Sequence, residues 1–374
     1  MNSKSINIAS LIAFILLIVS CGKSENSDKI IILKSVEEYD FKDLEINKMI
    51  QFEATKSNLL GMYLDVRFSR DNFWVLDLNN SNSIFGFDSE GRSLGYVAQV
   101  GEGPNTILNI RDFLVSNDTI IVLSNLGDQV EISKWNKHNS LLDKRRVEAN
   151  GYTFIDDKIK NKWYLYSGYN KVAGKYRLNR YDKDFNKDKE YLENDFGDEI
   201  LPFLERSFFQ GYRRTLFKES LLSEVYELGE QDLKLVYEID FGSYQVPDLF
   251  WQKDPFEGFE MINENGFANI SFIAESEKHF LIEIQIQEDG VPRKELLFIE
   301  KSSGKRIKVK VDQDQSAFFY SPFGFDESGN VLFYAYSRIA EKFMDSISDR
   351  VKENLKFEKD GNPVIIYAKV PDFK

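Results

Sequence analysis

The sequence predicts an all-β fold, and three observations carry that prediction. From Asp43 onward, apolar and polar residues alternate at period 2 over short stretches, which is the pattern of half-buried strands. Gly, Asn, Asp and Ser separate these stretches, as they do at turns between strands. The whole pattern recurs about every 46 residues. A four-stranded antiparallel unit repeated at roughly 40–50 residues is typical of a β-propeller blade.

Two strand–turn–strand segments show the repeat most clearly. Residues 65–78 and 112–125 each contain a strand, a Ser-x-Asp turn and a hydrophobic strand, and they start 47 residues apart. The second half of each unit also repeats. In each unit, an aromatic residue followed by an acid or an amide begins a polar turn. These pairs are Phe87-Asp88, Trp135-Asn136, Tyr181-Asp182 and Tyr226-Glu227. Since one such sheet cannot bury both of its apolar faces, the units must stack around a common axis.

Counting the repeats gives six units. Their predicted ranges are 58–98, 108–148, 152–192, 203–240, 266–311 and 317–370. The sixth unit lacks a fourth strand of its own. The alternating segment 44–52 precedes the first unit, and we expect it to supply that strand and close the ring. The sequence therefore predicts a six-bladed β-propeller of four-stranded antiparallel blades over residues 44–374.

Two segments interrupt the repeat. Residues 241–265 lengthen the connection between the fourth and fifth units, and Pro247 and Pro255 argue against regular structure there. Long loops on a rigid scaffold often carry binding residues. In residues 338–356, apolar side chains recur every four positions, which predicts one amphipathic helix inserted near the C-terminus. We expect its apolar stripe to pack on the propeller, with a partner-docking helix as the alternative.

The first 20 residues predict an export signal. Lys4 is their only charge, and the apolar run 11–19 that follows is too short to span a bilayer. The run ends at Cys21, the single cysteine of the chain, at the point where a signal peptide would be cleaved. The segment Ile18-Val19-Ser20-Cys21 resembles the lipobox of bacterial lipoproteins, so we expect residues 21–43 to be a lipidated cysteine and a tether. Several acyl chains on Cys21 would hold the protein on a membrane stably. A cleaved signal with an incidental cysteine is the alternative.

The composition limits the possible functions. The chain carries 48 Lys and Arg against 61 Asp and Glu. This balance argues against a nucleic-acid partner, because neutralising phosphates requires clustered basic residues. With His138 and His279 as the only histidines, a three-His zinc site is excluded and a Ser-His-Asp triad has few possible bases. We therefore expect no cofactor, no metal and no catalytic residue, although an enzyme remains an alternative.

A glycine-rich turn gives the chain a family resemblance. Gly101, Gly103 and Pro104 form a Gly-x-Gly-Pro sequence, in which the glycines permit a positive φ and the proline fixes its own φ. No helix start follows, so this is a structural turn and not a phosphate cradle. The segment resembles the turn after the first blade in six-bladed β-propeller lipoproteins of Bacteroidetes-type bacteria, relatives of the NHL-repeat propellers. Thr106 stands where these proteins usually have Glu.

The flanking residues extend this resemblance. In that family, a motif like residues 87–91 precedes the turn and a strand like residues 110–115 follows it. The resemblance implies the propeller architecture and a lipid anchor in the cell envelope, with the outer membrane favoured and the periplasmic or surface face left open. It implies no particular ligand or reaction.

The inner strand of each blade lines the axial funnel of a propeller, so polar residues there are binding candidates. Arg could hold a carboxylate with two hydrogen bonds, and Trp or Tyr could stack on a sugar ring. The ligand-binding candidates are Arg67, Arg111, Asp112, Arg206 and Trp251, with Asp65, Arg213 and Tyr244 as further members of the set. For any single one of them, a solvated or ion-paired residue of its blade is the favoured alternative.

The sequence thus favours a lipid-anchored envelope propeller that binds a partner protein or an extracellular polymer without catalysis. One alternative is a propeller lyase or hydrolase, which an acid–base pair at the axial mouth would support. The other is an envelope assembly or structural factor, which would be supported if residues 241–265 and 338–356 formed one exposed apolar patch. The membrane, through Cys21, and a protein or polysaccharide are the expected partners.

Overall fold

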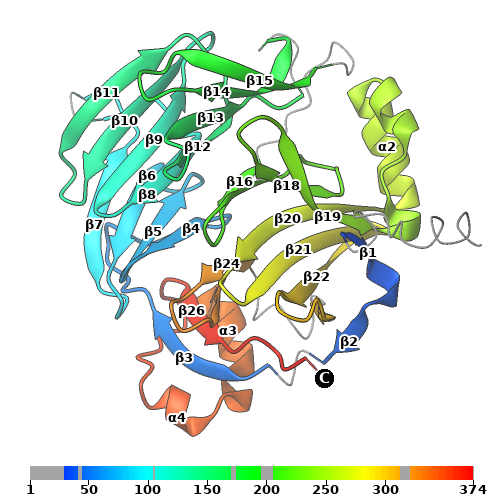
Figure 1. The fold of residues 1–374 in the computed structure, drawn as a ribbon. Helices are drawn as coiled ribbons and strands as arrows, with labels where there is room; N and C mark the ends of the chain where they lie inside the picture. Colours follow the sequence, from blue (N-terminus) through cyan, green and yellow to red (C-terminus); the bar gives the residue numbers. More distant parts are fainter. Residues whose placement is uncertain are drawn as a thin grey trace, which may run out of the picture.

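Six antiparallel sheets surround a central axis in the computed structural model, which describes residues 29–40, 44–103, 106–169, 174–194, 205–311 and 321–373 (Figure 1). The predicted six-bladed propeller is therefore confirmed. Blades one to three are formed by consecutive strands, from the axis outward: β4 (Asp65–Ser69), β5 (Asn72–Asp77), β6 (Ser83–Phe87) and β7 (Ser93–Gln99); β8 (Asp112–Ser116), β9 (Thr119–Asn125), β10 (Val130–Asn136) and β11 (Leu141–Val147); β12 (Thr153–Asp157), β13 (Lys162–Tyr166), β14 (Tyr176–Tyr181) and β15 (Lys187–Glu193).

Blades four and five follow the same order, and blade six takes only three strands from the C-terminal part of the chain. The strands are β16 (Phe208–Gln210), β17 (Thr215–Phe217), β18 (Glu224–Leu228) and β19 (Leu233–Asp240); β20 (Phe267–Glu275), β21 (His279–Glu288), β22 (Val291–Glu300) and β23 (Arg306–Val311); β24 (Ser321–Phe325), β25 (Val331–Ala335) and β26 (Val364–Ala368).

The ring is closed by β3 (Ile46–Gln51), which pairs antiparallel with β26 as the fourth strand of blade six. The predicted closing strand is thus confirmed. Phe52 follows β3 and stacks on Phe87 of blade one, with ring centroids 4.2 Å apart. Gly91 allows this closure, because a Cβ at that position would lie 2.3 Å from the Gln51 carbonyl oxygen and φ is +81°.

The hydrophobic core lies between neighbouring blades. Between blades one and two, for example, Trp74 and Ile84 pack in one cluster with Phe113 and Trp135, and all four side chains are buried. Such large flat side chains fill the space between two twisted sheets. Each blade is therefore stabilised mainly by its neighbours, as expected of a repeat fold.

The repeated aromatic–Asx pairs form turns in the first three blades. The Asp88 carboxylate accepts hydrogen bonds from the backbone N–H groups of Glu90 and Arg92. Asn136 and Asp182 make the equivalent pairs of bonds, two and four residues ahead. An Asx side chain that satisfies local N–H groups in this way explains why the motif recurs at each turn. In blade four, Glu227 lies within β18 instead.

The Gly-x-Gly-Pro segment is also a turn, between β7 and β8. The Gly101 N–H donates to the Ile107 carbonyl (3.0 Å), and the Thr106 hydroxyl donates to the Gly103 carbonyl (2.6 Å). Neither glycine has a positive φ, contrary to our expectation. Gly101 instead leaves room for Thr106, whose methyl carbon would lie 3.2 Å from an added Cβ. Pro104 lies outside the described residues.

Two short strands were not predicted. β1 (Ile30–Ile32) and β2 (Glu37–Tyr39) pair in parallel with the outer strands β19 and β23, and the 3-10 helix η1 (Leu33–Ser35) lies between them. These strands lie within residues 21–43, which we expected to be a tether. Part of that range therefore belongs to the propeller. The side chain of Ile31 is fully buried against blades four and five.

The segment 241–265 is regular, contrary to the prediction from its prolines. It contains η4 (Gly242–Tyr244), η5 (Asp248–Gln252) and the helix α2 (Pro255–Asn265). Asp254 caps α2 by accepting from the N–H groups of Phe256 and Glu257. Pro255 occupies the first helical position, where its missing N–H costs no hydrogen bond, so this proline starts a helix.

The segment 338–356 is helical, but in pieces. It forms α3 (Ser337–Phe343), η7 (Met344–Ser346) and α4 (Asp349–Lys352), and the extended residue Ile347 separates η7 from α4. Ile347 and Val351 are buried in the core of blade six, so the apolar stripe packs on the propeller as we expected. The 241–265 segment packs in a different cluster, around Phe250 and Ile262. The two segments therefore do not form one apolar patch.

Cys21 and the predicted signal of residues 1–20 lie outside the described residues. Within the described part of the chain, no helix is both long and apolar enough to cross a bilayer.

Candidate functional site

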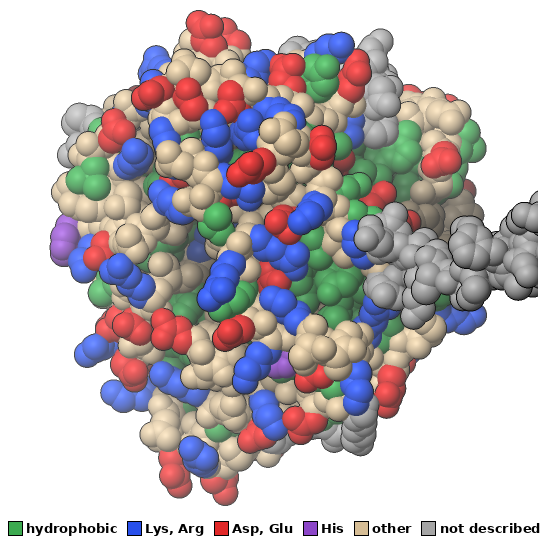
Figure 2. Space-filling model, in the orientation of Figure 1, with side chains coloured by type: hydrophobic (Ala, Val, Ile, Leu, Met, Phe, Trp, Pro, Cys, Tyr) green, Lys and Arg blue, Asp and Glu red, His purple; other side chains and the backbone are tan. Residues whose placement is uncertain are grey.

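The inner strands of all six blades end around one pocket on the axis. Its volume is about 510 Å³, and its wall includes Phe68 of β4, Ser116 of β8, Gln210 of β16 and Phe325 of β24. The ring is hollowed near its centre, where hydrophobic side chains are visible inside a rim of charged ones (Figure 2). We call this cavity the axial pocket.

The floor of the axial pocket is a buried ion-pair network. Arg67 donates from Nη2 to Asp112 (2.5 Å) and to Asp65 (2.8 Å). The second Asp112 oxygen accepts from the Thr153 hydroxyl (2.7 Å) and the Phe154 N–H (3.0 Å). Burial alone would lower the pKa of Arg67, but the two carboxylates outweigh it and raise the pKa above its ordinary value. The network joins blades one, two and three at the axis.

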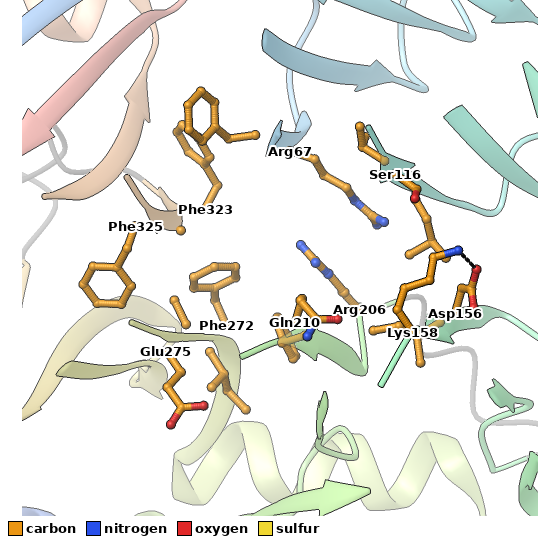
Figure 3. Close-up of a pocket in the computed structure, with 18 of the residues that line it drawn as sticks. Arg67, Ser116, Asp156, Lys158, Arg206, Gln210, Phe272, Glu275, Phe323 and Phe325 are labelled. Carbon is orange, nitrogen blue, oxygen red and sulfur yellow. Dashed lines mark hydrogen bonds and ion pairs between the residues drawn. The ribbon is translucent and has the colours of Figure 1, made fainter. Parts of the chain in front are cut away.

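Arg206 stands beside Arg67 in a different electrostatic environment (Figure 3). Its Nε donates to the Phe208 carbonyl (2.9 Å), and its guanidinium lies over the Phe209 ring, 5.0 Å from the centroid. Within the described residues, no carboxylate lies within ion-pair distance of it. Burial and the neighbouring Arg67 charge lower the pKa of Arg206 to about 10. It is still a cation at neutral pH, and one that lacks a counter-ion among these residues.

The acids of the axial pocket are already neutralised by cations. Asp156 accepts from Lys158 and from Lys183 (2.6 Å). Glu275 pairs with Arg214 and with Lys301, each at 2.7 Å. Each of these carboxylates thus already has two cationic partners. The two acids therefore leave Arg206 as the cation that is available to an incoming group.

Much of the remaining wall is apolar. Phe272 and Phe323 face the pocket across from the two arginines, and Leu114 and Ile155 line it as well (Figure 3). Such a wall accepts apolar groups of a ligand, while a few polar side chains fix its orientation. The arrangement can therefore bind a ligand that combines an anionic group with an apolar body.

The structure brings some of the binding candidates from the sequence together at the axis and places the others elsewhere. Arg67, Asp112 and Arg206 come together at the axis, with Asp65 bound to Arg67. Arg111 precedes β8 at the opposite end of the channel and lies over the Tyr152 ring, 5.1 Å from its centroid.

The candidates from loops also lie away from the axial pocket. Trp251 packs beside α2 with its ring 4.8 Å from that of Tyr169. Arg213 lies over the Tyr212 ring, and Tyr244 lies beside Arg293. Among the histidines, His138 is in the exposed β10–β11 turn, whereas His279 stacks on Phe373 between blades five and six. Among the described residues, no three His, Cys, Asp or Glu side chains are grouped as metal ligands would be.

Sequence reasoning missed several residues of the pocket wall. Gln210 and Phe325 end their inner strands and Lys158 directly follows one, whereas Phe272 lies three residues before the end of β20. The signal was present, because a residue that ends the first strand of any repeat reaches the axis. Applying one register to all six repeats would have found them.

Comparisons with known proteins agree with the fold. The solved structure of an exported protein from Bacteroides fragilis NCTC 9343 is similar over 92% of this chain and 99% of its own. The two sequences are 15% identical, and the TM-score is 0.73. A member of the DUF4221 family from Bacteroides vulgatus is similar over 88% of this chain and 98% of its own, at 11% identity and a TM-score of 0.55. At these identities the likeness shows the fold alone. No curated protein matches the sequence.

One family covers nearly the whole propeller. The domain of unknown function DUF4934 matches residues 35–369, which include β2 and all six blades. The chain therefore belongs to the DUF4934 family.

Proposed function

We propose that this chain is a lipid-anchored propeller of the cell envelope, and that it binds an acidic segment of a partner protein in the axial pocket without catalysis. One observation carries the binding part of the proposal, namely the Arg206 guanidinium without a carboxylate partner among the described residues. A cation held partly out of water gains more from a bound anion than an exposed one does. A carboxylate could take both outer nitrogens of the guanidinium.

The pocket wall favours a peptide over an extracellular polymer. Phe272 and Phe323 offer apolar surface for side chains, whereas neutral hydrogen-bonding groups for sugar hydroxyls are few, such as Ser116 and Gln210. A peptide that carries both acidic and apolar side chains matches this mixture. The acidic polymer and the hydrolase or lyase stay alternative outcomes of the test.

The envelope location rests on two supports. The sequence of residues 1–21 has the features of a lipoprotein signal, and the similar Bacteroides fragilis protein is described as exported. We favour the outer membrane, on its periplasmic or its outer surface. Labelling with radioactive palmitate should mark the chain and fail to mark C21S, and labelling of C21S would contradict the anchor.

Binding can be tested with the full chain in detergent and a short probe, an acetylated Phe-Glu dipeptide amide whose C-terminal amide carries a fluorophore. Fluorescence anisotropy should detect binding that R206Q weakens at least about tenfold, because one charge-assisted bidentate contact is lost. The control is R338Q, which removes an equal charge from an exposed ion pair on α3. Binding that is equal in R206Q and R338Q, or turnover of the probe, would contradict the proposal.

A further inference from the structure

A second cavity adjoins the axial pocket on the same face. It lies between blades two and three, has a volume of about 300 Å³, and shares Asp156 and Lys158 with the axial pocket. The side chains of Lys134 and Arg145 form its blade-two wall, and Lys183 stands on the blade-three side. We call this cavity the basic groove.

The basic groove keeps a surplus of positive charge. Four cations line it against two acids, Asp143 and Asp156. Asp156 is shared by Lys158 and Lys183, and Asp143 pairs with Lys134 at 3.3 Å. Arg145 is left over, because no carboxylate of the described residues lies within ion-pair distance of it.

Arg145 shares the aromatic contact of Arg206, although its side chain is exposed. Its guanidinium lies over the Phe185 ring, 5.3 Å from the centroid, as that of Arg206 lies over Phe209. Stacking on an aromatic ring restrains a guanidinium and leaves its N–H edge free for an anion. Two guanidinium groups of this kind thus lie in adjoining cavities, with Lys158 between the cavities.

The opposite exit from the axial pocket carries the reverse charge. A groove of about 920 Å³ between blades five and six shares Glu275 and Phe325 with the axial pocket. Two lysines and six acids line it, and the acids are Glu275, Glu277, Glu300, Asp326, Glu327 and Asp372. An anionic chain that leaves the axial pocket is repelled on this side and attracted on the other.

The charge of the sequence follows the same division. Residues 130–190 hold 15 Lys and Arg against 9 Asp and Glu, although the whole chain holds 48 against 61. The basic groove therefore lies within a basic stretch of an acidic protein.

We propose that the acidic peptide runs from the axial pocket into the basic groove, with one carboxylate on Arg206 and a second on Arg145. This inference rests on the proposed function and adds the direction of the ligand and its second acidic residue. The rings of the groove favour a peptide over an acidic polysaccharide. Trp163 already stacks on Phe154 and Phe185, so its faces are not free for a sugar.

The test compares a short and a long probe on the full chain. The short probe is the acetylated Phe-Glu dipeptide amide, and the long probe extends it by eight residues of alternating Ser and Glu. Fully extended, such a decapeptide spans up to about 33 Å, which lets its acids reach out of the axial pocket. R145Q should weaken the long probe about tenfold and leave the short probe within about twofold.

R146Q is the matched control. Arg146 is the next residue of β11, where side chains alternate between faces, and it pairs with Glu131 (3.1 Å), outside the basic groove. It should change neither probe by more than about twofold, although it removes the same charge. Equal effects of R145Q and R146Q on the long probe would overturn the inference.

The remaining outcomes separate this inference from the proposed function. If neither probe binds the unaltered chain, the proposed function itself fails. If R206Q weakens both probes while R145Q weakens neither, the axial site stands and the path into the basic groove is wrong. If an oligomer of polygalacturonate binds in an Arg145-dependent way and the long peptide does not, the ligand is a polysaccharide and the peptide proposal is overturned.

Discussion

Two neighbouring arginines in the axial pocket have opposite surroundings. On the floor, Arg67 is tied to Asp65 and Asp112 and joins three blades. Beside it, Arg206 stacks on Phe209 and has no carboxylate partner among the described residues. A buried charge with partners belongs to the structure of the fold, whereas one without partners is available to a ligand. The comparison shows that position on the axis alone does not make a residue a binding residue.

The largest effect is expected on the floor. D112N removes a carboxylate whose side chain is only 6% exposed, and it leaves the buried Arg67 with Asp65 alone. We expect the free energy of unfolding to fall by about 3 kcal/mol, as when one partner of a buried ion pair is lost. Chemical denaturation of the full chain measures it. D65N is the comparison, because Asp65 is 35% exposed and should cost about 1 kcal/mol, and equal losses would contradict this assignment.

A second buried acid, on another blade, tests whether its ion pairs also stabilise the fold. The Glu275 side chain is 1% exposed and pairs with Arg214 and Lys301. E275Q should lower the free energy of unfolding by about 2 kcal/mol, because it leaves two cations underpaired. It should also tighten binding of the short acidic probe, since the pocket gains positive charge. E277Q, at an exposed hydrogen bond to Tyr212, should change both quantities little. Equal effects of the two substitutions would break the comparison.

Replacing Arg206 should raise the free energy of unfolding, whereas replacing an ion-paired residue should lower it. Its pKa is lowered to about 10, so the folded chain holds this proton less tightly than the unfolded chain does. At neutral pH the charge therefore opposes folding, and that penalty is relieved as the pH rises through 10. R206Q should raise the free energy of unfolding by about 1 kcal/mol at pH 7. This is a net value, because the substitution also removes the contacts of the arginine side chain.

The pH dependence supplies the control for this prediction. The advantage of R206Q should shrink when denaturation is repeated at a pH above 10, because the unaltered chain then sheds the same charge. Binding of the acidic probe to the unaltered chain should weaken over the same pH range. A stability difference that stays constant with pH would show that the contacts of Arg206, and not its charge, are responsible.

The smallest effect is expected for Arg111, which lies over Tyr152 at the other end of the channel. R111Q should change the free energy of unfolding by no more than about 0.5 kcal/mol. The affinity for the acidic probe should stay within about twofold. A loss of affinity as large as that of R206Q would show that the ligand reaches through the channel to Arg111, and the assignment of binding to Arg206 would fail.

The architecture followed from the sequence because its signals are local and repeated. Alternation at period 2, the Asx turns after Phe87, Trp135 and Tyr181, and the closing strand are each readable within a few residues. The strands β1 and β2 carry no such signal. They are three residues long and are fixed by pairing with β19 and β23, which are distant in sequence. Only the folded propeller creates the edges on which they form.

The pocket was less predictable for a related reason. The sequence ranks Arg67 and Arg206 alike, since both are basic residues near the start of a unit. Their difference depends on Asp112, which reaches Arg67 at 2.5 Å from the next blade. The helix α2 was missed because Pro255 was interpreted without its cap, Asp254. In both cases a neighbour decides what the residue does.

The strands β1 and β2 also determine how the molecule bears mechanical load. A pull on the chain before Lys29 reaches β1 first, and β1 lies parallel to β19 on the outer edge of blade four. Force along that strand loads its hydrogen bonds in shear, together, and not one after another. The ring itself is closed elsewhere, by β3 and β26 in blade six. Closure of the ring, and with it the axial pocket, therefore does not depend on the hydrogen bonds that β1 would load first.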